Sequence, residues 1–173
     1  MNYKKFLEYI RLEAEAHQEK VLPAATAHRK FPSGETNPYF THPLWCAMML
    51  LLETRLPESI RLPGSEALLF HDVLEDTSAK LPKDISEEVK SIIQNMTFEN
   101  FEDEVKETLK KPPKDQLLKL YDKTATLYDG ALMPHRYPEW IDFTEKLIET
   151  VEKEYGQLNI VLLARALIAQ HSK

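Results

Sequence analysis

The sequence predicts a single all-α domain. Apolar residues recur three and four positions apart along most of the chain, which is the spacing of one helix face, and no stretch alternates with the period of two that marks a strand. Glycines and prolines fall mainly between the periodic segments, where helices begin and end. The chain has 173 residues, enough for a substantial core, and we expect one domain over residues 1–173.

The periodic segments give the order of the helices. Phe6, Ile10 and Ala14 mark one face of a first helix, which continues through His17 to Val21. Later helices are expected near residues 43–54, 65–77, 85–96, 100–111, 115–129, 140–151 and 157–170. Breaks are expected at the four glycines and at several prolines, among them Gly34, Gly64, Gly130, Gly156, Pro57 and Pro63.

Composition excludes several classes of protein. The single cysteine, Cys46, rules out an internal disulfide framework, and its apolar neighbours predict a core position. The first twenty residues are charged throughout, unlike a signal peptide, and the run CAMMLLL is far too short to span a bilayer. The net charge of -6 argues against a nucleic-acid surface. We expect a cytoplasmic protein with no membrane or nucleic-acid partner, and no pattern indicates an oligomeric state.

The segment FHDVLEDT, at residues 70–77, places one histidine and three carboxylates beside apolar residues. On a continuous helix, His71 and Glu75 share one face, and Asp72 and Asp76 share the adjoining one. Burying unpaired carboxylates is costly, so a divalent cation that neutralises them is the expected reason for this arrangement. The alternative is a solvated, acidic helix end.

Two further residues are candidate ligands of the same cation. His42 follows Thr41, an expected N-cap, and so lies at a rigid helix start; the alternative is a histidine bonded to a backbone carbonyl. Asp122 shares a helix face with Leu118 and points inward, either as a ligand or as half of an internal salt bridge. Two histidines and two aspartates suit Mn²⁺, Fe²⁺, Ni²⁺ or Zn²⁺.

Three segments, PYFTHP, ALLFHDVLEDT and KLYDKTAT, occur in this order along the chain. They resemble the PYxxHP, ALLHDxxEDT and KLADKxxN motifs of the HD-domain hydrolases of the RelA/SpoT type, especially the small stand-alone alarmone hydrolases. The likeness covers roughly residues 26–130, and the segment RYPEW at residues 136–140 is also similar to the family, but more weakly. It implies a single helical HD-domain fold of about seven helices and a metal-dependent phosphohydrolase.

The resemblance also implies roles for individual residues. It implies one divalent ion, with Mn²⁺ as the expected metal, bound by His42, His71, Asp72 and Asp122. It further implies that Glu75 and Asp76 handle the attacking water and the leaving group.

Substrate contacts are expected on two segments. The basic segment RKFPSG resembles a phosphate-binding segment of the family, which makes either Arg29 or Lys30 a phosphate contact. Lys119, Lys123 and Thr126 share one face of the helix over 115–129, where the lysines would attract an anionic substrate. Thr126 stands where the family has an asparagine, which bears on contacts with the nucleotide.

The expected function is hydrolysis of a (p)ppGpp-type alarmone at its 3' position, with release of pyrophosphate. The nearest alternative is an HD-domain phosphatase that acts on another nucleotide or a dinucleotide cofactor. Two others are a non-catalytic, metal-bound nucleotide sensor and a helical scaffold without metal. The presence of both Glu75 and Asp76 favours turnover over sensing.

Other charged and polar residues are expected to be structural. His17 lies on the apolar stripe of its helix and is expected to be a satisfied core histidine. Arg165 interrupts a nearly apolar helix and is expected to pair with an inward carboxylate. The segments DISEEVK and ENFEDEVKETLKK are expected to be solvated helix faces.

Overall fold

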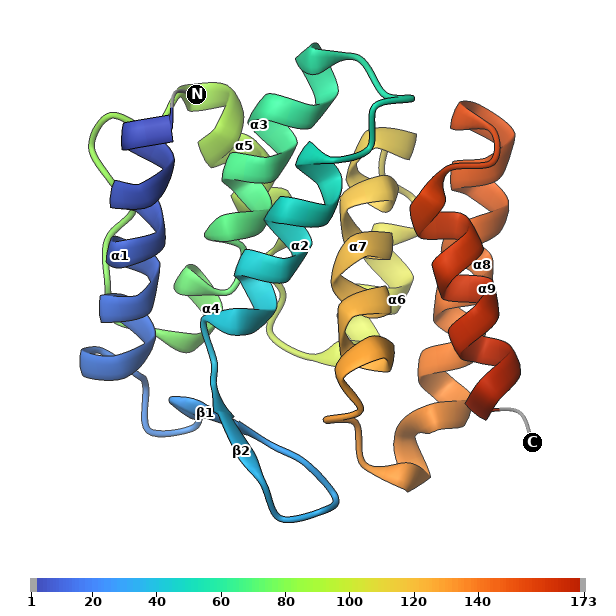
Figure 1. The fold of residues 1–173 in the computed structure, drawn as a ribbon, viewed down its shortest axis with the longest axis horizontal. Helices are drawn as coiled ribbons and strands as arrows, with labels where there is room; N and C mark the ends of the chain where they lie inside the picture. The colour runs from blue at the N-terminus through green and yellow to red at the C-terminus, as the bar shows by residue number, and fades with distance from the viewer. Residues whose placement is uncertain (1–2, 172–173) are drawn as a thin grey trace.

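The computed structural model describes residues 3–171 and confirms the all-α prediction (Figure 1). Its helices are α1 (Tyr3–Glu19), α2 (Thr41–Leu51), α3 (Glu58–Leu69), α4 (Val73–Asp76), α5 (Glu87–Met96), α6 (Phe101–Thr108), α7 (Pro113–Asp129), α8 (Tyr137–Tyr155) and α9 (Asn159–His171), with a 3-10 turn, η1 (Pro134–Arg136), before α8. None of the helices in this part of the chain is long and apolar enough to span a bilayer.

A two-stranded hairpin is an element that the sequence pattern did not predict. Its strands, β1 (His28–Lys30) and β2 (Thr36–Pro38), pair antiparallel with Arg29 opposite Asn37. Gly34 adopts a φ of 90° in the connecting loop, a conformation that side chains disfavour. Strands of three residues are too short to display a period of two, which is why no alternation marks them. The hairpin lies below the start of α2, where it forms one wall of the site described next (Figure 1).

The helix expected over 65–77 is divided differently in the structure. Helix α3 begins at Glu58 and runs through Pro63 and Gly64, so these two residues lie inside a helix and not at a break. The helix ends at Leu69, and a turn over residues 70–72 leads into the four-residue α4. His71 and Asp72 therefore lie in a turn between two helices, and the expectation that they share one helix with Glu75 and Asp76 is wrong.

Gly64 lies inside α3 because two helices approach it closely. A Cβ atom at this position would lie 2.8 Å from the Leu50 side chain of α2, closer than real Cβ atoms come to a neighbour, and 3.0 Å from the Leu118 side chain of α7, tighter than most such contacts. Figure 1 shows α2 and α3 side by side at the centre of the molecule, with α7 next to α2. The glycine thus sets the spacing of the central helices.

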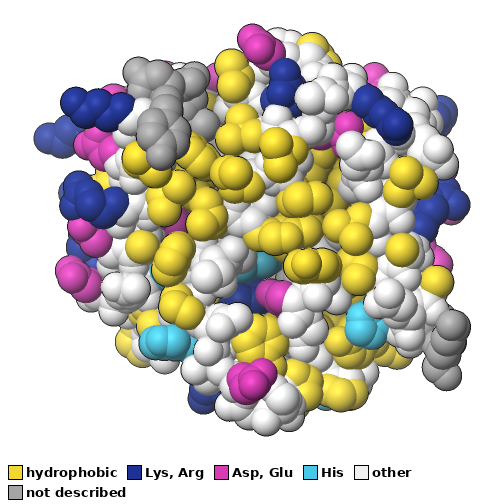
Figure 2. All heavy atoms as spheres, in the orientation of Figure 1, with side chains coloured by type: hydrophobic (Ala, Val, Ile, Leu, Met, Phe, Trp, Pro, Cys, Tyr) yellow, Lys and Arg dark blue, Asp and Glu magenta, His cyan; other side chains and the backbone are white. Residues whose placement is uncertain are grey.

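Helix α2 is apolar on two faces. His42, Cys46 and Leu50 recur at four-residue spacing and are buried, which confirms the core position expected for Cys46. Met48 of α2 and Leu52, directly after the helix, are exposed to solvent, as is Leu162 of α9. Figure 2 shows hydrophobic side chains spread across this face of the molecule. The polar cluster described next includes His42, at the N-terminal end of the buried face of α2.

Candidate metal centre and pocket

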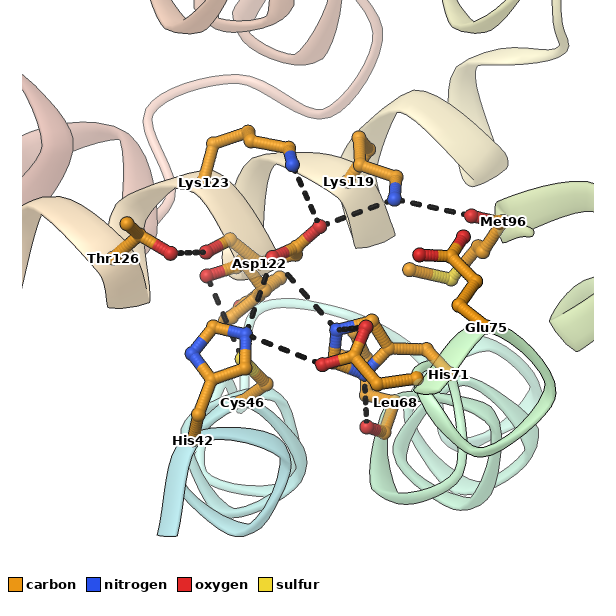
Figure 3. A network of polar contacts seen from close by, with 12 residues as sticks. His42, Cys46, Leu68, His71, Glu75, Met96, Lys119, Asp122, Lys123 and Thr126 are labelled. Carbon is orange, nitrogen blue, oxygen red and sulfur yellow. Dashed lines mark hydrogen bonds and ion pairs between the residues drawn. The ribbon is translucent and has the colours of Figure 1, made fainter. Parts of the chain in front are cut away.

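Three separate segments bring two imidazoles and two carboxylates together (Figure 3). His42 comes from the first turn of α2, His71 and Asp72 from the turn after α3, and Asp122 from the middle of α7. Ligand atoms of His42, His71 and Asp72 all lie within 4.8 Å of one another. Asp122 Oδ1 lies 3.2 Å from His42 Nε2 and 3.7 Å from His71 Nε2. All four side chains are buried.

Local contacts aim both imidazoles at the cluster. His71 Nδ1 donates a 2.7 Å hydrogen bond to the carbonyl oxygen of Leu68, so its Nε2 is free to act as a ligand atom. His42 is fixed by the start of α2, but the cap differs from the prediction. Phe40 occupies the N-cap position, and Thr41 is the first helical residue, whose hydroxyl donates to the carbonyl oxygen of Pro38. A helix boundary displaced by one residue keeps His42 in the first turn.

One oxygen of each carboxylate is already held by a donor from the protein. Asp72 Oδ2 accepts a 3.0 Å hydrogen bond from the Tyr39 hydroxyl. Asp122 Oδ2 lies 3.1 Å from Lys119 Nζ and 3.2 Å from Lys123 Nζ. The other oxygen of each group, Oδ1, faces the histidines. Asp72 Oδ1 lies 3.1 Å from His71 Nε2, and Asp122 Oδ1 lies 3.2 Å from His42 Nε2. Each carboxylate therefore presents one oxygen to the centre of the cluster.

The charges of the cluster suit a cation. Burial keeps the pKa of His42 below its usual value, and the Arg29 guanidinium adds to this effect. Burial also disfavours charge on His71, but Asp72 and Asp122 outweigh it and raise the pKa of His71 to about 9. Burial alone would raise the pKa of Asp122, but the neighbouring lysines hold it well below its usual range. Without a metal, a proton on His71 offsets part of this negative charge.

The residues present fit a divalent ion. Two nitrogen and two oxygen donors form a set that first-row divalent metals bind. His71 Nε2 is buried, makes no hydrogen bond with any residue that the structure describes, and lies 3.1 Å from Asp72 Oδ1 and 3.7 Å from Asp122 Oδ1, so these three atoms could bind one cation. The cluster could therefore hold one metal ion.

Glu75 and Asp76 differ in their relation to the cluster. Glu75 lines the adjoining pocket, and its Oε1 accepts a 2.7 Å hydrogen bond from the backbone amide of Phe98. Burial, reinforced by the charge of Asp72, raises the pKa of Glu75 to about 7. Asp76 does not line the pocket, although burial and Asp72 raise its pKa as well. Of the two acids, Glu75 is the one placed to meet a bound molecule.

The pocket above the cluster has a volume of about 430 Å³. It is bounded by the hairpin, the loop before α6, α6 itself, α7 and η1. All four residues expected to contact substrate line it, namely Arg29, Lys30, Lys123 and Thr126. The fold thus brings these residues to one cavity, although they lie on segments far apart in the sequence.

The two basic residues of β1 are held differently. Arg29 Nε lies 2.8 Å from Asp129 Oδ2, and its Nη2 donates to the Thr126 hydroxyl at 3.4 Å. Lys30 makes no ion pair within residues 3–171 and lies at the exposed edge of the pocket. Arg29 is therefore fixed in place, whereas the ammonium group of Lys30 has all its donors free.

Lys119 and Lys123 are buried and paired with carboxylates. Both ammonium groups contact Asp122 and also Glu104 of α6. A direct contact between Lys123 and a substrate would require one of these pairs to open, and that contact stays a prediction. Glu104 is 7% exposed, so the expectation that its segment is wholly solvated is wrong. Its spacing of three from Phe101 and four from Thr108 was the signal that could have placed it inward.

Tyr39 contacts both Asp72 and His17, and the sequence did not indicate either contact. The Tyr39 ring stacks on His17, with ring centroids 4.7 Å apart, and its hydroxyl reaches Asp72. His17 Nδ1 lies 2.7 Å from Glu13 Oε1, and both side chains are buried, which confirms the core position of His17, although its Nε2 has no hydrogen-bond partner among the residues that the structure describes. Arg165 pairs with Glu152 at the surface. The prediction of a carboxylate partner is therefore confirmed, but the prediction that this carboxylate points inward is wrong.

A solved structure shares this fold. The chain matches a metazoan ortholog of SpoT that hydrolyses ppGpp and plays a role in starvation responses, with a TM-score of 0.72 and 22% sequence identity. The match covers 98% of this chain and 97% of the other. The fold is the HD-domain fold. The resemblance to small stand-alone alarmone hydrolases is therefore confirmed at the level of structure. No family model and no curated protein sequence matches the chain.

Proposed function

We propose that the protein is a metal-dependent phosphohydrolase that removes the 3'-pyrophosphate from a (p)ppGpp-type alarmone. The observation that carries this proposal is the buried group of two histidines and two aspartates at the base of a pocket with basic residues on its walls. The HD-domain fold, shared with a protein that hydrolyses ppGpp, supports the same conclusion. An intracellular nucleotide substrate would place the protein in the cytoplasm.

The metal site comprises His42, His71, Asp72 and Asp122, with Mn²⁺ as the proposed ion. When bound, such an ion supplies an activated water near neutral pH and offsets negative charge on a phosphoryl group. Glu75 is the proposed catalytic acid–base. Its Oε1 is held by the Phe98 amide, which leaves Oε2 to exchange a proton, and a carboxyl with a pKa of about 7 does so near neutral pH.

The atoms of the reaction balance without a further reactant. The water oxygen forms a bond to the phosphorus attached to the 3' oxygen, and the bond between that phosphorus and the 3' oxygen breaks. Glu75 takes up the proton that water loses and gives it to the 3' oxygen of the nucleoside as that oxygen leaves. The products are pyrophosphate and a nucleotide that keeps its 5' phosphates. Asp76 lies outside the pocket but interacts with Tyr39, which donates to Asp72, so Asp76 would act indirectly through this pair.

The proposed substrate contacts are on the opposite wall. Lys30 has free donors for phosphate, and Arg29, fixed by Asp129, can offer its remaining nitrogen. The hydroxyl of Thr126 would meet the nucleoside. Thr126 also favours a second candidate function, because the family has an asparagine here and the shorter hydroxyl already accepts a hydrogen bond from Arg29. That candidate is the same chemistry on a different nucleotide or dinucleotide.

A nucleotide panel with Mn²⁺ tests the proposal, with pyrophosphate and orthophosphate measured separately. We expect ppGpp to yield GDP and pyrophosphate, and the Asp122→Asn variant to be inactive. Release of orthophosphate alone, or much faster turnover of another nucleotide, would favour the second candidate. Tight nucleotide binding without any product would instead indicate a sensor.

A further inference from the structure

Glu104 is a buried carboxylate on a short helix whose other acidic side chains face solvent. Glu102 and Asp103 of α6 are exposed, whereas Glu104 is buried against α7. A carboxylate in such a position is costly unless cations neutralise it. Lys119 Nζ lies 2.6 Å from Glu104 Oε1, and Lys123 Nζ lies 2.8 Å from the same oxygen.

The two lysines connect Glu104 to the metal site. Each ammonium group that contacts Glu104 also contacts Asp122 Oδ2, at 3.1 Å from Lys119 and 3.2 Å from Lys123 (Figure 3). Lys119 donates in addition to the carbonyl oxygen of Met96 at 3.2 Å, so its three N–H groups all have acceptors. Lys123 lies over the Trp140 ring, 4.4 Å from its centroid. These contacts leave the lysines little freedom to turn toward a ligand.

The four groups balance in charge, with two ammonium groups against two carboxylates. Asp122 Oδ2 faces the lysines and Oδ1 faces His42 and His71, so Asp122 is shared between the lysines and a metal ion. If Glu104 lost its charge, both ammonium groups would have Asp122 as their remaining carboxylate partner in this cluster. They would then compete more strongly with the ion for its charge.

We propose that Glu104 is a positioning residue for the metal site: it takes up half of the charge of Lys119 and Lys123 and so leaves Asp122 Oδ1 available as a ligand. The inference rests on the proposed metal site, but not on the identity of the nucleotide. Glu104 touches neither the ion nor the substrate in this role.

The test is a Mn²⁺ titration of chelator-treated Glu104→Gln, which keeps the shape of the side chain and removes its charge. We expect Mn²⁺ to bind ~10-fold or more weakly, within the range seen when a group that supports a ligand is changed. Glu102→Gln, on the exposed face of the same helix, is the matched control and should bind Mn²⁺ like the wild type. KM for the nucleotide should change little when Mn²⁺ is saturating.

A charge-balanced double variant separates this role from simple loss of folding. Adding Lys123→Met to Glu104→Gln leaves one lysine for one carboxylate, and it should recover part of the lost Mn²⁺ affinity. Unchanged Mn²⁺ affinity in Glu104→Gln, or further loss in the double variant, would overturn the inference. A lower KM with unchanged Mn²⁺ affinity would also overturn it, because Glu104 would then act on substrate. A wild-type protein that binds no divalent ion would overturn both this inference and the proposed function.

Discussion

The backbone amide of Phe98 donates a 2.7 Å hydrogen bond to Oε1 of Glu75, across the pocket wall between α5 and α6. This bond fixes one oxygen of a carboxyl group whose pKa burial and Asp72 raise to about 7. It orients the other oxygen without making Glu75 a metal ligand.

Replacing Glu75 by glutamine should therefore reduce turnover and spare the metal. The amide keeps the shape but cannot exchange a proton, and loss of a general acid–base costs roughly two to four orders of magnitude in rate. Single-turnover kinetics beside metal analysis of the same preparation measures both effects. Asp76→Asn should have a smaller effect on the rate, because Asp76 does not line the pocket. Equal rates in Glu75→Gln and the wild type would remove Glu75 from the mechanism.

The purified protein should contain about one divalent ion per chain, because residues 3–171 bring together one set of four proposed ligands. His71→Ala and Asp122→Ala should each lose the ion. Both should also lose stability, since the partners left behind are buried charges. Elemental analysis and thermal unfolding with and without a chelator measure these outcomes. Full occupancy in both variants would contradict the assignment of the site.

Tyr39→Phe tests the support of the other acidic ligand. The change removes the hydroxyl that donates to Asp72 Oδ2 at 3.0 Å and keeps the stacking on His17. We expect Mn²⁺ affinity to fall by roughly tenfold, with little change in the unfolding temperature of the metal-free protein. Tyr128→Phe, at an exposed position on α7, is the control. A loss of stability without a loss of affinity would make Tyr39 a packing residue only.

The metal-free protein should become less stable as pH rises from about 6.5 to 9. His71 has a pKa near 6.5 when unfolded and about 9 when folded, so the folded state binds its proton more tightly. The stabilisation is complete below pH 6.5 and is lost as pH rises through 9. Glu75 acts in the same direction at lower pH, between its ordinary value of 4.5 and about 7, so the test uses pH 7 to 9.

Mn²⁺ should reverse this trend, because the ion binds His71 only after the proton has left. Mn²⁺ affinity should therefore rise with pH over the same interval. Thermal unfolding across pH, with chelator and with Mn²⁺, measures both slopes. His135→Gln, which alters an exposed histidine, should leave them unchanged. Parallel slopes with and without Mn²⁺ would contradict His71 as a ligand.

The sequence predicted the helical architecture and the four clustered side chains because both leave a local signal. Helical periodicity marks each long helix, and the His-Asp motifs are dense in residues that an apolar core tolerates only with compensation. The helix boundaries around Pro63 and Gly64 were not predictable in this way. Which residue a glycine approaches depends on tertiary packing, here on Leu50 and Leu118, and no local pattern records it.

The contacts that support the site were also beyond local patterns. Glu104 lies in a segment so rich in charge that it resembles a solvated surface, and only the position of α7 gives its carboxylate two buried partners. The bond from Tyr39 to Asp72 joins residues 33 positions apart, with α2 and α3 between them in the chain. Such pairings become visible only when the helices are assembled.

The close approach at Gly64 ties the geometry of the site to a residue that takes no part in it. His42 lies at the start of α2 and His71 just after the end of α3, with their rings 5.4 Å apart, and Leu50 of α2 packs directly against Gly64 of α3. A larger residue at position 64 would push these helices apart and increase the distance between the His42 and His71 rings. A genetic screen that scores activity alone would then report Gly64 among the active-site residues, although the defect would be one of helix spacing.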